Sequence, residues 1–140
     1  MLAWSVAAVS SVALIIFVLV PVMADQLAEF LPPSGEKALG DKTFEQIRSV
    51  MTDDFNDVIG ICENAEGRAA LDAMQAKLEP HVDLPYPLTV EVLDHDLINA
   101  FALPGGRVVL FRGLIDAAET PDEVAAVLAH ATGHVVHRDP

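Results

Sequence analysis

The chain opens on an unbroken apolar run and turns to mixed apolar and polar positions afterwards. Residues 2–23 contain no charged side chain, and roughly 20 apolar residues are enough to cross a bilayer as a helix. We therefore predict a transmembrane anchor over residues 1–24, with Trp4 as an interfacial aromatic near one end. A cleaved signal peptide is the alternative, because residues 22–24 resemble a small-residue cleavage site. The length of the run and the absence of Lys or Arg before it favour the anchor, and a buried core helix is a third reading.

Behind this segment, apolar side chains return at helical spacing in two places. Residues 25–42 include the sequence Pro32-Pro33-Ser34-Gly35 and are predicted to form a linker. Apolar positions recur every three or four residues across 43–59 and again across 65–78. Both stretches are predicted to be helices that pack against the rest of the domain, and the second ends before Pro80.

Three short stretches read as strands. They cover residues 88–93, 98–103 and 107–111. The second and third are joined only by Pro104-Gly105-Gly106, and a three-residue connection with two glycines is typical of a tight antiparallel hairpin. A short helix or turn is predicted at 113–118. We therefore expect a small antiparallel sheet whose hairpin supplies an edge strand.

The last helix has the clearest beginning in the sequence. Thr120 as N-cap, Pro121 at the first helical position and Glu123 at the third form a capping box. The order of elements is then helix, helix, sheet and helix. This order places residues 43–140 in the α+β class, as one domain behind the N-terminal segment.

The charge of the chain excludes some classes of partner. All 21 acidic and 8 basic side chains follow residue 24, so this part carries the whole net charge of −13. Nucleic-acid binding needs clustered Lys and Arg, and an acidic surface is also repelled by anionic lipid. We therefore expect a well-solvated acidic surface and no nucleic-acid partner. Cys62 is the single cysteine, so no internal disulfide can form.

Two histidines on the last helix are the strongest sign of chemistry. His130 and His134 are four residues apart, which places them on one face of a helix where both can bind one metal ion. This is the spacing of the zinc-protease pattern H-E-x-x-H, in which the glutamate is the general base. Here Ala131 stands in that position. A chance pair is the alternative, but the otherwise apolar helix and Gly133, which would allow close packing, favour a metal site.

The other histidines are not predicted to be ligands. His137 follows His130 by seven residues, which at a rise of ~1.5 Å puts their backbones roughly 10 Å apart. Zinc–nitrogen bonds are only about 2.0–2.1 Å long, so both cannot bind one ion unless the helix unwinds. We predict a supporting or surface role for His137, and exposed positions for His81 and His95.

Two segments of the chain carry a resemblance to a known family. The first runs from Asn99 to Leu114 and reads Asn-Ala-Phe-Ala-Leu-Pro-Gly-Gly-Arg-Val-Val-Leu-Phe-Arg-Gly-Leu, and the second runs from Glu119 to His130. Together they resemble the membrane-associated zinc metallopeptidases of gluzincin type that include HtpX and the CAAX prenyl proteases. The similarity extends over residues 31–140. It implies a zincin-like domain and a zinc-dependent endopeptidase of proteins or peptides.

The resemblance also implies roles for individual residues. His130 and His134 match the first two zinc ligands of the family. Asn99, Ala100 and Phe101 fall on the strand that resembles the family's substrate-binding edge, where an extended polypeptide adds by β-pairing. An apolar segment before such a domain is similar to bacterial members that act in the cell envelope. We therefore expect a single-pass membrane protein with its soluble domain in the periplasm, or a secreted protein if the segment is cleaved.

Two departures from the family pattern bear on activity. Ala131 and Thr132 replace the glutamate and the apolar residue that follow the first histidine, and a methyl group cannot accept a proton. The family's third ligand, a glutamate on a later helix, lies outside these 140 residues, which points to a truncated domain. We expect a zinc metalloendopeptidase by type whose present copy is inactive. The alternatives are a membrane-tethered pseudoprotease that holds extended segments, and a truncation product that folds poorly.

Overall fold

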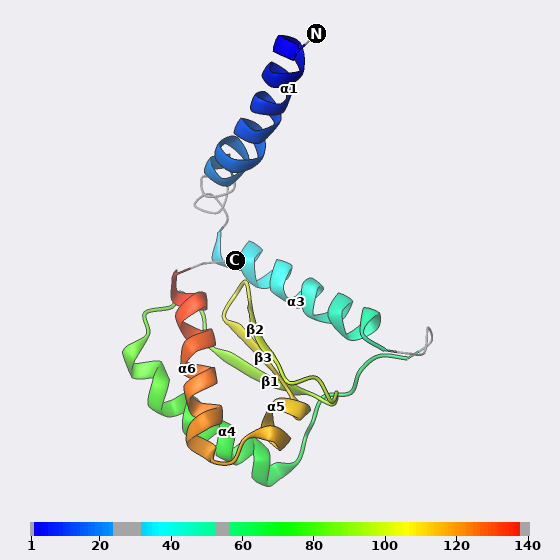
Figure 1. The fold of residues 1–140 in the computed structure, drawn as a ribbon. Helices are drawn as coiled ribbons and strands as arrows, with labels where there is room; N and C mark the ends of the chain where they lie inside the picture. Colours follow the sequence, from blue (N-terminus) through cyan, green and yellow to red (C-terminus); the bar gives the residue numbers. More distant parts are fainter. Residues whose placement is uncertain (1, 24–31, 53–56, 138–140) are drawn as a thin grey trace. The chain divides into compact units, whose positions relative to one another are not determined.

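The structure is a computed structural model that describes residues 2–23, 32–52 and 57–137. The chain divides into two compact units, Met1–Pro32 and Pro33–Pro140 (Figure 1). The first unit contains helix α1, Leu2–Leu14, followed by a π-helical turn, η1, Ile15–Leu19. The N–H of Val20 donates to the carbonyl of Ile15 and closes this wider turn.

The predicted membrane anchor is not confirmed. In the part of the chain that the structure describes, no helix combines the length and the apolar character of a membrane span. The π-helical turn divides the apolar run, so α1 itself ends at Leu14. The two ends of the predicted anchor, residues 1 and 24, lie outside the described residues. The anchor therefore stays a prediction.

The second unit is built on a three-stranded sheet of mixed direction (Figure 1). The central strand β3, Arg107–Phe111, pairs in parallel with β1, Thr89–Leu93, and in antiparallel fashion with β2, Ala100–Leu103. The hairpin is confirmed, but the expectation of a purely antiparallel sheet is wrong. The chain passes from β1 to the outer position of β2, and the hairpin then returns β3 between them in the direction of β1.

The side chains of β3 alternate between two apolar cores, one on each face of the sheet. Val108 and Leu110 point into a core that they share with helices α4, Ala65–Leu78, and α6, Pro121–His137. Val109 and Phe111 point into a second core under helix α3, Pro33–Val50. All four side chains are completely buried. A continuous apolar run of this kind is typical of a strand that is covered on both faces.

Helices α4 and α6 begin at the residues that the sequence predicts. The Asn64 side chain caps α4 by accepting hydrogen bonds from the N–H groups of Glu66 and Gly67, both at 3.0 Å. At the start of α6, the Glu123 carboxylate accepts from the N–H of Glu119 at 3.0 Å. That bond reaches one residue further back than Thr120, the predicted N-cap. The short helix α5, Arg112–Ala117, lies where a helix or turn was predicted.

The helix predicted over 43–59 lies earlier in the chain. Helix α3 begins at Pro33, so residues 33–42, which we predicted to be linker, form its first half. Its buried side is made by Glu36, Gly40 and Phe44, which are four residues apart. Only one of these three side chains is hydrophobic, so apolar spacing does not reveal the start of the helix. Residues 53–56 of the predicted range lie outside the described residues.

Glu36 and Gly40, on the buried side of α3, each contact a residue that is distant in the sequence. The Tyr86 hydroxyl donates a hydrogen bond of 2.7 Å to Oε2 of Glu36, which is 6 % exposed. A Cβ atom on Gly40 would lie 2.0 Å from the carbonyl oxygen of Pro104 in the β2–β3 turn. Gly105 in the same turn has a φ of 79°, in the left-handed region that favours glycine. The glycines therefore allow α3 to lie directly on the hairpin.

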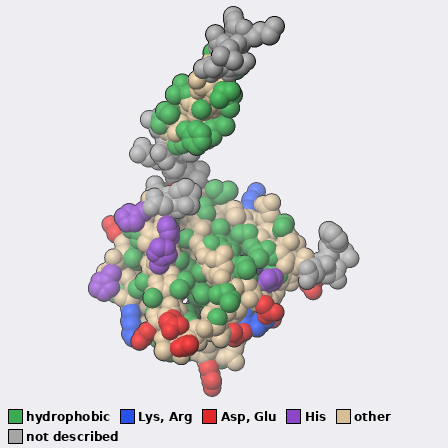
Figure 2. Space-filling view, in the orientation of Figure 1, with side chains coloured by type: hydrophobic (Ala, Val, Ile, Leu, Met, Phe, Trp, Pro, Cys, Tyr) green, Lys and Arg blue, Asp and Glu red, His purple; other side chains and the backbone are tan. Residues whose placement is uncertain are grey.

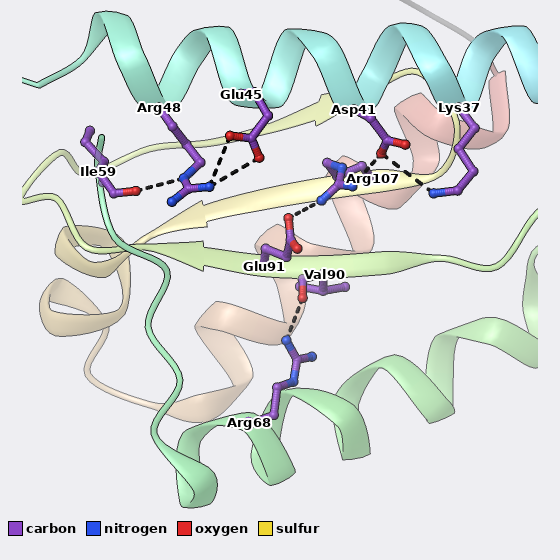
Figure 3. A network of polar contacts seen from close by, with 9 residues as sticks. All are labelled: Lys37, Asp41, Glu45, Arg48, Ile59, Arg68, Val90, Glu91 and Arg107. Carbon is purple, nitrogen blue, oxygen red and sulfur yellow. Dashed lines mark hydrogen bonds and ion pairs between the residues drawn. The ribbon is translucent and has the colours of Figure 1, made fainter. Parts of the chain in front are cut away.

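A polar network ties α3 to the sheet (Figure 3). The guanidinium of Arg107 on β3 donates to Asp41 on α3 at 2.6 Å and to Glu91 on β1. It also lies 4.5 Å from the ring centroid of Phe44. The hydrogen bond from Arg107 lowers the pKa of the Asp41 carboxyl below its ordinary value. The Asp41 carboxylate therefore keeps its charge to lower pH than an ordinary aspartate, and Arg107 joins three elements through one side chain.

Two glycine-to-alanine changes should have opposite effects on the free energy of unfolding. Gly40 lies where α3 contacts the hairpin, and Gly133 serves as the comparison because it lies away from that contact. Gly40→Ala places a methyl group against the Pro104 carbonyl and should lower the free energy of unfolding by about 1–3 kcal/mol. Gly133→Ala, inside α6, meets no atom within 4 Å and should raise it by roughly 0.5–1 kcal/mol, because alanine is the better helix former. Urea unfolding of both variants measures the difference. Equal stabilisation by both would show that α3 does not pack on the turn.

Candidate metal and peptide-binding site

Helix α6 places His130 and His134 side by side on its exposed face. Their Nε2 atoms are 3.2 Å apart, and their ring planes are nearly perpendicular at 88°. Two nitrogens bound to one tetrahedral zinc ion at ~2.0–2.1 Å lie roughly 3.3 Å apart. The two side chains therefore already have the spacing of two ligands on one zinc ion. The same distance suits a hydrogen bond between the imidazoles, which a metal would replace.

The described residues offer only this pair as ligands. Across residues 2–23, 32–52 and 57–137, no three or more His, Cys, Asp or Glu side chains come together as a metal-binding group. His137 is exposed near the end of α6, as predicted for a surface position. His81 is also exposed, in the short 3-10 helix Glu79–His81. Two nitrogens would fill half of a tetrahedral coordination shell, so within the described part of the chain the pair offers two of the four ligands that such a site needs.

His95 differs from its prediction. It is half-buried rather than exposed, because its ring packs edge-on against Phe111, with 5.9 Å between the ring centroids. Its Nδ1 accepts a hydrogen bond of 3.0 Å from the N–H of Leu97. The N–H of Gly113 in turn donates to the His95 carbonyl. His95 therefore shapes the loop between β1 and β2 and takes no part in the metal site.

Position 131, where the pattern H-E-x-x-H has its glutamate, is occupied by a packing residue in this chain. Ala131 is 5 % exposed and belongs to the core beneath α6. Thr132 is also buried, and its hydroxyl donates a hydrogen bond of 2.7 Å to the Leu128 carbonyl. The methyl group of Ala131 holds no proton acceptor. The close packing that we expected at Gly133 is absent among the described residues, since an added Cβ there would contact nothing within 4 Å.

The predicted substrate strand lies at an edge of the sheet. Asn99 directly precedes β2, and its carbonyl accepts from the N–H of Phe111 on β3. Because outward and inward main-chain groups alternate along an antiparallel strand, the N–H groups of Ala100 and Ala102 point away from β3. The Asn99 side chain accepts from the first of these, Ala100 N–H, at 2.8 Å. An incoming peptide carbonyl would have to take the place of this side chain.

The side chains of β2 divide between the two cores. Phe101 packs on the α3 side, with its ring centroid 5.6 Å from that of Phe111. Ala100 and Ala102 face the core of α6, where their small size allows the helix to pack on the strand. Phe101 therefore serves as a packing residue. The part of β2 that can meet a peptide is its backbone edge, beside the helix that carries the histidines.

The opposite edge of the sheet is closed by hydrogen bonds. Carbonyl groups of β1, and that of Leu88 just before it, point away from β3. They accept hydrogen bonds from one main-chain N–H and from two side chains of α4. These bonds are Cys62 N–H to Val92 at 2.8 Å, Arg68 Nη1 to Val90 at 2.6 Å and Gln75 Nε2 to Leu88 at 2.8 Å. Covered edges do not add further strands. Of the two edges in the described structure, β2 is therefore the one at which a further strand would meet fewer hydrogen-bonded main-chain groups.

Comparisons with known proteins agree with this arrangement. The family model "Peptidase family M48" matches residues 66–140, more than half of the chain. A mitochondrial metalloendopeptidase OMA1 of Arabidopsis thaliana is 43% identical over 49 residues, which are 35% of this chain and 10% of the relative. A protease HtpX homolog of Thermoplasma acidophilum is 43% identical over 54 residues, 36% of this chain and 17% of the relative.

A bacterial relative extends the alignment further along this chain. The beta-barrel assembly-enhancing protease of Escherichia coli (strain K12) is 32% identical over 69 residues, 49% of this chain and 14% of the relative. The chain thus spans less than a fifth of the length of these relatives. The family match begins in α4 and includes the sheet, the open edge and the histidine helix. Because the match covers the very elements that carry the resemblance, the chain belongs to peptidase family M48.

Proposed function

We propose that these 140 residues form the peptide-holding part of an M48 metalloendopeptidase and supply two of its zinc ligands. An extended polypeptide pairs with the free edge of β2, and His130 and His134 bind zinc beside it. By itself the chain holds the peptide without cutting it. The relatives are named as proteases and metalloendopeptidases, which supports a polypeptide as the class of substrate.

The observation that carries this proposal is the difference between the two sheet edges. The β1 edge is closed by donors from α4, whereas β2 presents the outward groups of Ala100 and Ala102 next to α6. A peptide on this edge gains main-chain hydrogen bonds, which is the recognition mode of β-strand addition. The net charge of −13 on the chain favours peptide segments that carry little negative charge.

The spacing of the histidine pair suits zinc, but the neighbouring position 131 carries no group that can act as a general base. When bound in a complete site, zinc acts as a Lewis acid that activates water and polarises the peptide carbonyl. Here the two imidazoles are spaced for such an ion, and Ala131 contributes a buried methyl group. The role of these residues is therefore to position a metal next to a held peptide. We also propose that the N-terminal apolar segment attaches the chain to a membrane with the domain on the extracytoplasmic side; alkaline extraction of a membrane fraction tests the attachment, and protease protection tests the side.

Proline at position 102 should abolish peptide holding. Ala102→Pro removes an outward N–H donor but leaves the bonds between β2 and β3 in place, because edge strands accept proline at such positions. We expect binding of an extended, uncharged peptide to weaken at least about tenfold, or ~1.4 kcal/mol. Fluorescence anisotropy of a labelled peptide measures this, and Ala102→Val is the matched control. Unchanged binding in the folded proline variant would place the peptide elsewhere.

The histidine pair should bind zinc weakly and with a stoichiometry near one. Calorimetric titration of the chain should give a signal that His134→Ala weakens at least about tenfold. His137→Ala is the control and should leave the titration unchanged, because its backbone lies roughly 10 Å from that of His130. If the wild-type chain binds no zinc, the 3.2 Å contact is only a hydrogen bond between the imidazoles. A loss in His137→Ala would mean that the end of α6 unwinds to supply a third ligand.

Restoring the glutamate should not restore cleavage in this chain. Ala131→Glu supplies a base but no third ligand, and its carboxylate enters an apolar core, so stability should fall by about 1–3 kcal/mol. Ala126→Glu, at an exposed position of the same helix, should change stability by less than about 0.5 kcal/mol. Cleavage of a quenched fluorescent peptide is the readout. Activity in the 140-residue Ala131→Glu chain would disprove the holding-only role.

A further inference from the structure

An apolar cavity lies at the end of α6 opposite the histidines. It has a volume of about 510 Å³ and opens between α4, α5 and the first turn of α6. Val124 is the α6 residue of its lining that comes closest in sequence to His130. The two are six positions apart, which corresponds to roughly 9 Å of helix. Most of the wall is made of aliphatic and sulfur-containing side chains, among them Cys62, Ala70, Leu71, Met74, Ile115 and Val124.

The rim of this cavity is acidic. Two arginines line it, and carboxylates already bind both of them. Arg68 lies 2.7 Å from Asp72, and Arg112 is bound by three aspartates: Asp94 at 2.6 Å, Asp116 at 2.7 Å, and Asp96. Glu119 lines the cavity as well. Of the five carboxylates, only Glu119 lines the cavity; the four aspartates lie behind the arginines and pair with them, so the two guanidinium groups and five carboxylates together carry a net charge of −3.

The space-filling view shows the same distribution of charge. In Figure 2 the acidic side chains gather over the lower part of the domain, at the end where α4, α5 and the beginning of α6 lie in Figure 1. Such a field attracts cations and repels carboxylate or phosphate groups. The volume falls within the roughly 300–1,000 Å³ that ligand pockets occupy. The apolar wall favours a body that leaves water on binding.

We propose that this cavity binds a small amphiphile with an apolar body and a cationic ammonium head group. The body lies against Leu71, Met74 and Ile115, and Glu119 at the rim receives the ammonium group. This site is separate from the β2 edge and from the histidine pair. Its occupation therefore does not depend on zinc or on peptide binding.

Three probes with one body and different head groups test the proposal on the 140-residue chain. They are 4-phenylbutylammonium, 4-phenylbutanol and 4-phenylbutyrate. Cys62 is the only thiol in the sequence and lines the cavity, so its rate of alkylation by iodoacetamide reports occupancy. Burial raises the pKa of this thiol, so the reaction is followed by mass spectrometry at about pH 9. We expect the cation to bind at least about fivefold more tightly than the alcohol, and the anion more weakly than both.

Two pairs of variants locate the effect. Ala70 and Ala69 are neighbouring exposed residues of α4, and only Ala70 lines the cavity. Ala70→Trp should block the mouth and remove protection of Cys62 by the cation, whereas Ala69→Trp should leave it unchanged. Glu119→Gln should reduce binding of the cation to the level of the alcohol. Saturation-transfer NMR on the probe provides a second measurement that does not use the thiol.

Each of the remaining outcomes would overturn the proposal. Equal protection by all three probes would mean that the cavity selects apolar bodies without regard to charge. No protection by any probe, together with no saturation transfer, would mean that the cavity binds no such ligand. If alkylation without any probe slows as the protein concentration rises, a second copy of the chain covers the cavity. Protection that persists in Ala70→Trp would place the probe at another site.

Discussion

The central strand β3 is the constraint on which both functional elements depend. Four consecutive residues, Val108 to Phe111, are completely buried, so each face of a small sheet has to be covered by helices. Covering one face with α4 and α6 brings the histidine helix against β2, and covering the other with α3 holds the β2–β3 turn in place. Arg107 at the start of β3 links α3 to β1 through Asp41 and Glu91. The position of the candidate site is therefore a consequence of core packing.

The two edges of this sheet differ in how their main-chain groups are hydrogen-bonded. This difference makes the edges unequal as sites for a further strand. On the β1 side, α4 donates hydrogen bonds from Arg68 and Gln75 to main-chain carbonyls. On the β2 side, the outward N–H of Ala100 meets only the short side chain of Asn99, its own neighbour. A local cap of this kind is exchanged more easily than a bond anchored in another helix, because no packed element has to move. The edge beside α6 is thus the one at which a polypeptide can add.

Local signals in the sequence predict the elements that begin with a defined cap, and they fail where the partner is distant. The Thr120-Pro121 pair marks the start of α6, because capping acts over three residues, and apolar spacing marks α4, whose observed N-cap is Asn64. The start of α3 depends on the hydrogen bond that Tyr86 donates to Glu36 and on Pro104 lying against Gly40, and neither contact has a local signature. The parallel pairing of β1 with β3 is likewise a tertiary choice. The spacing of His130 and His134 is local, so the proximity of their rings was predictable, whereas the burial of Ala131 was not.

The burial of Ala131 bears on what holds α6 against the sheet. A structural zinc site contributes folding energy directly, and its domain unfolds when the metal leaves. Here α6 is instead held by Val124, Leu128, Ala131 and Val135 on its apolar side, and the histidines stand on the exposed side. Replacing a carboxylate by a methyl group at position 131 adds one more packing residue to the held side. Ala131 therefore adds to the contact between α6 and the sheet, and the same contact holds α6 beside β2.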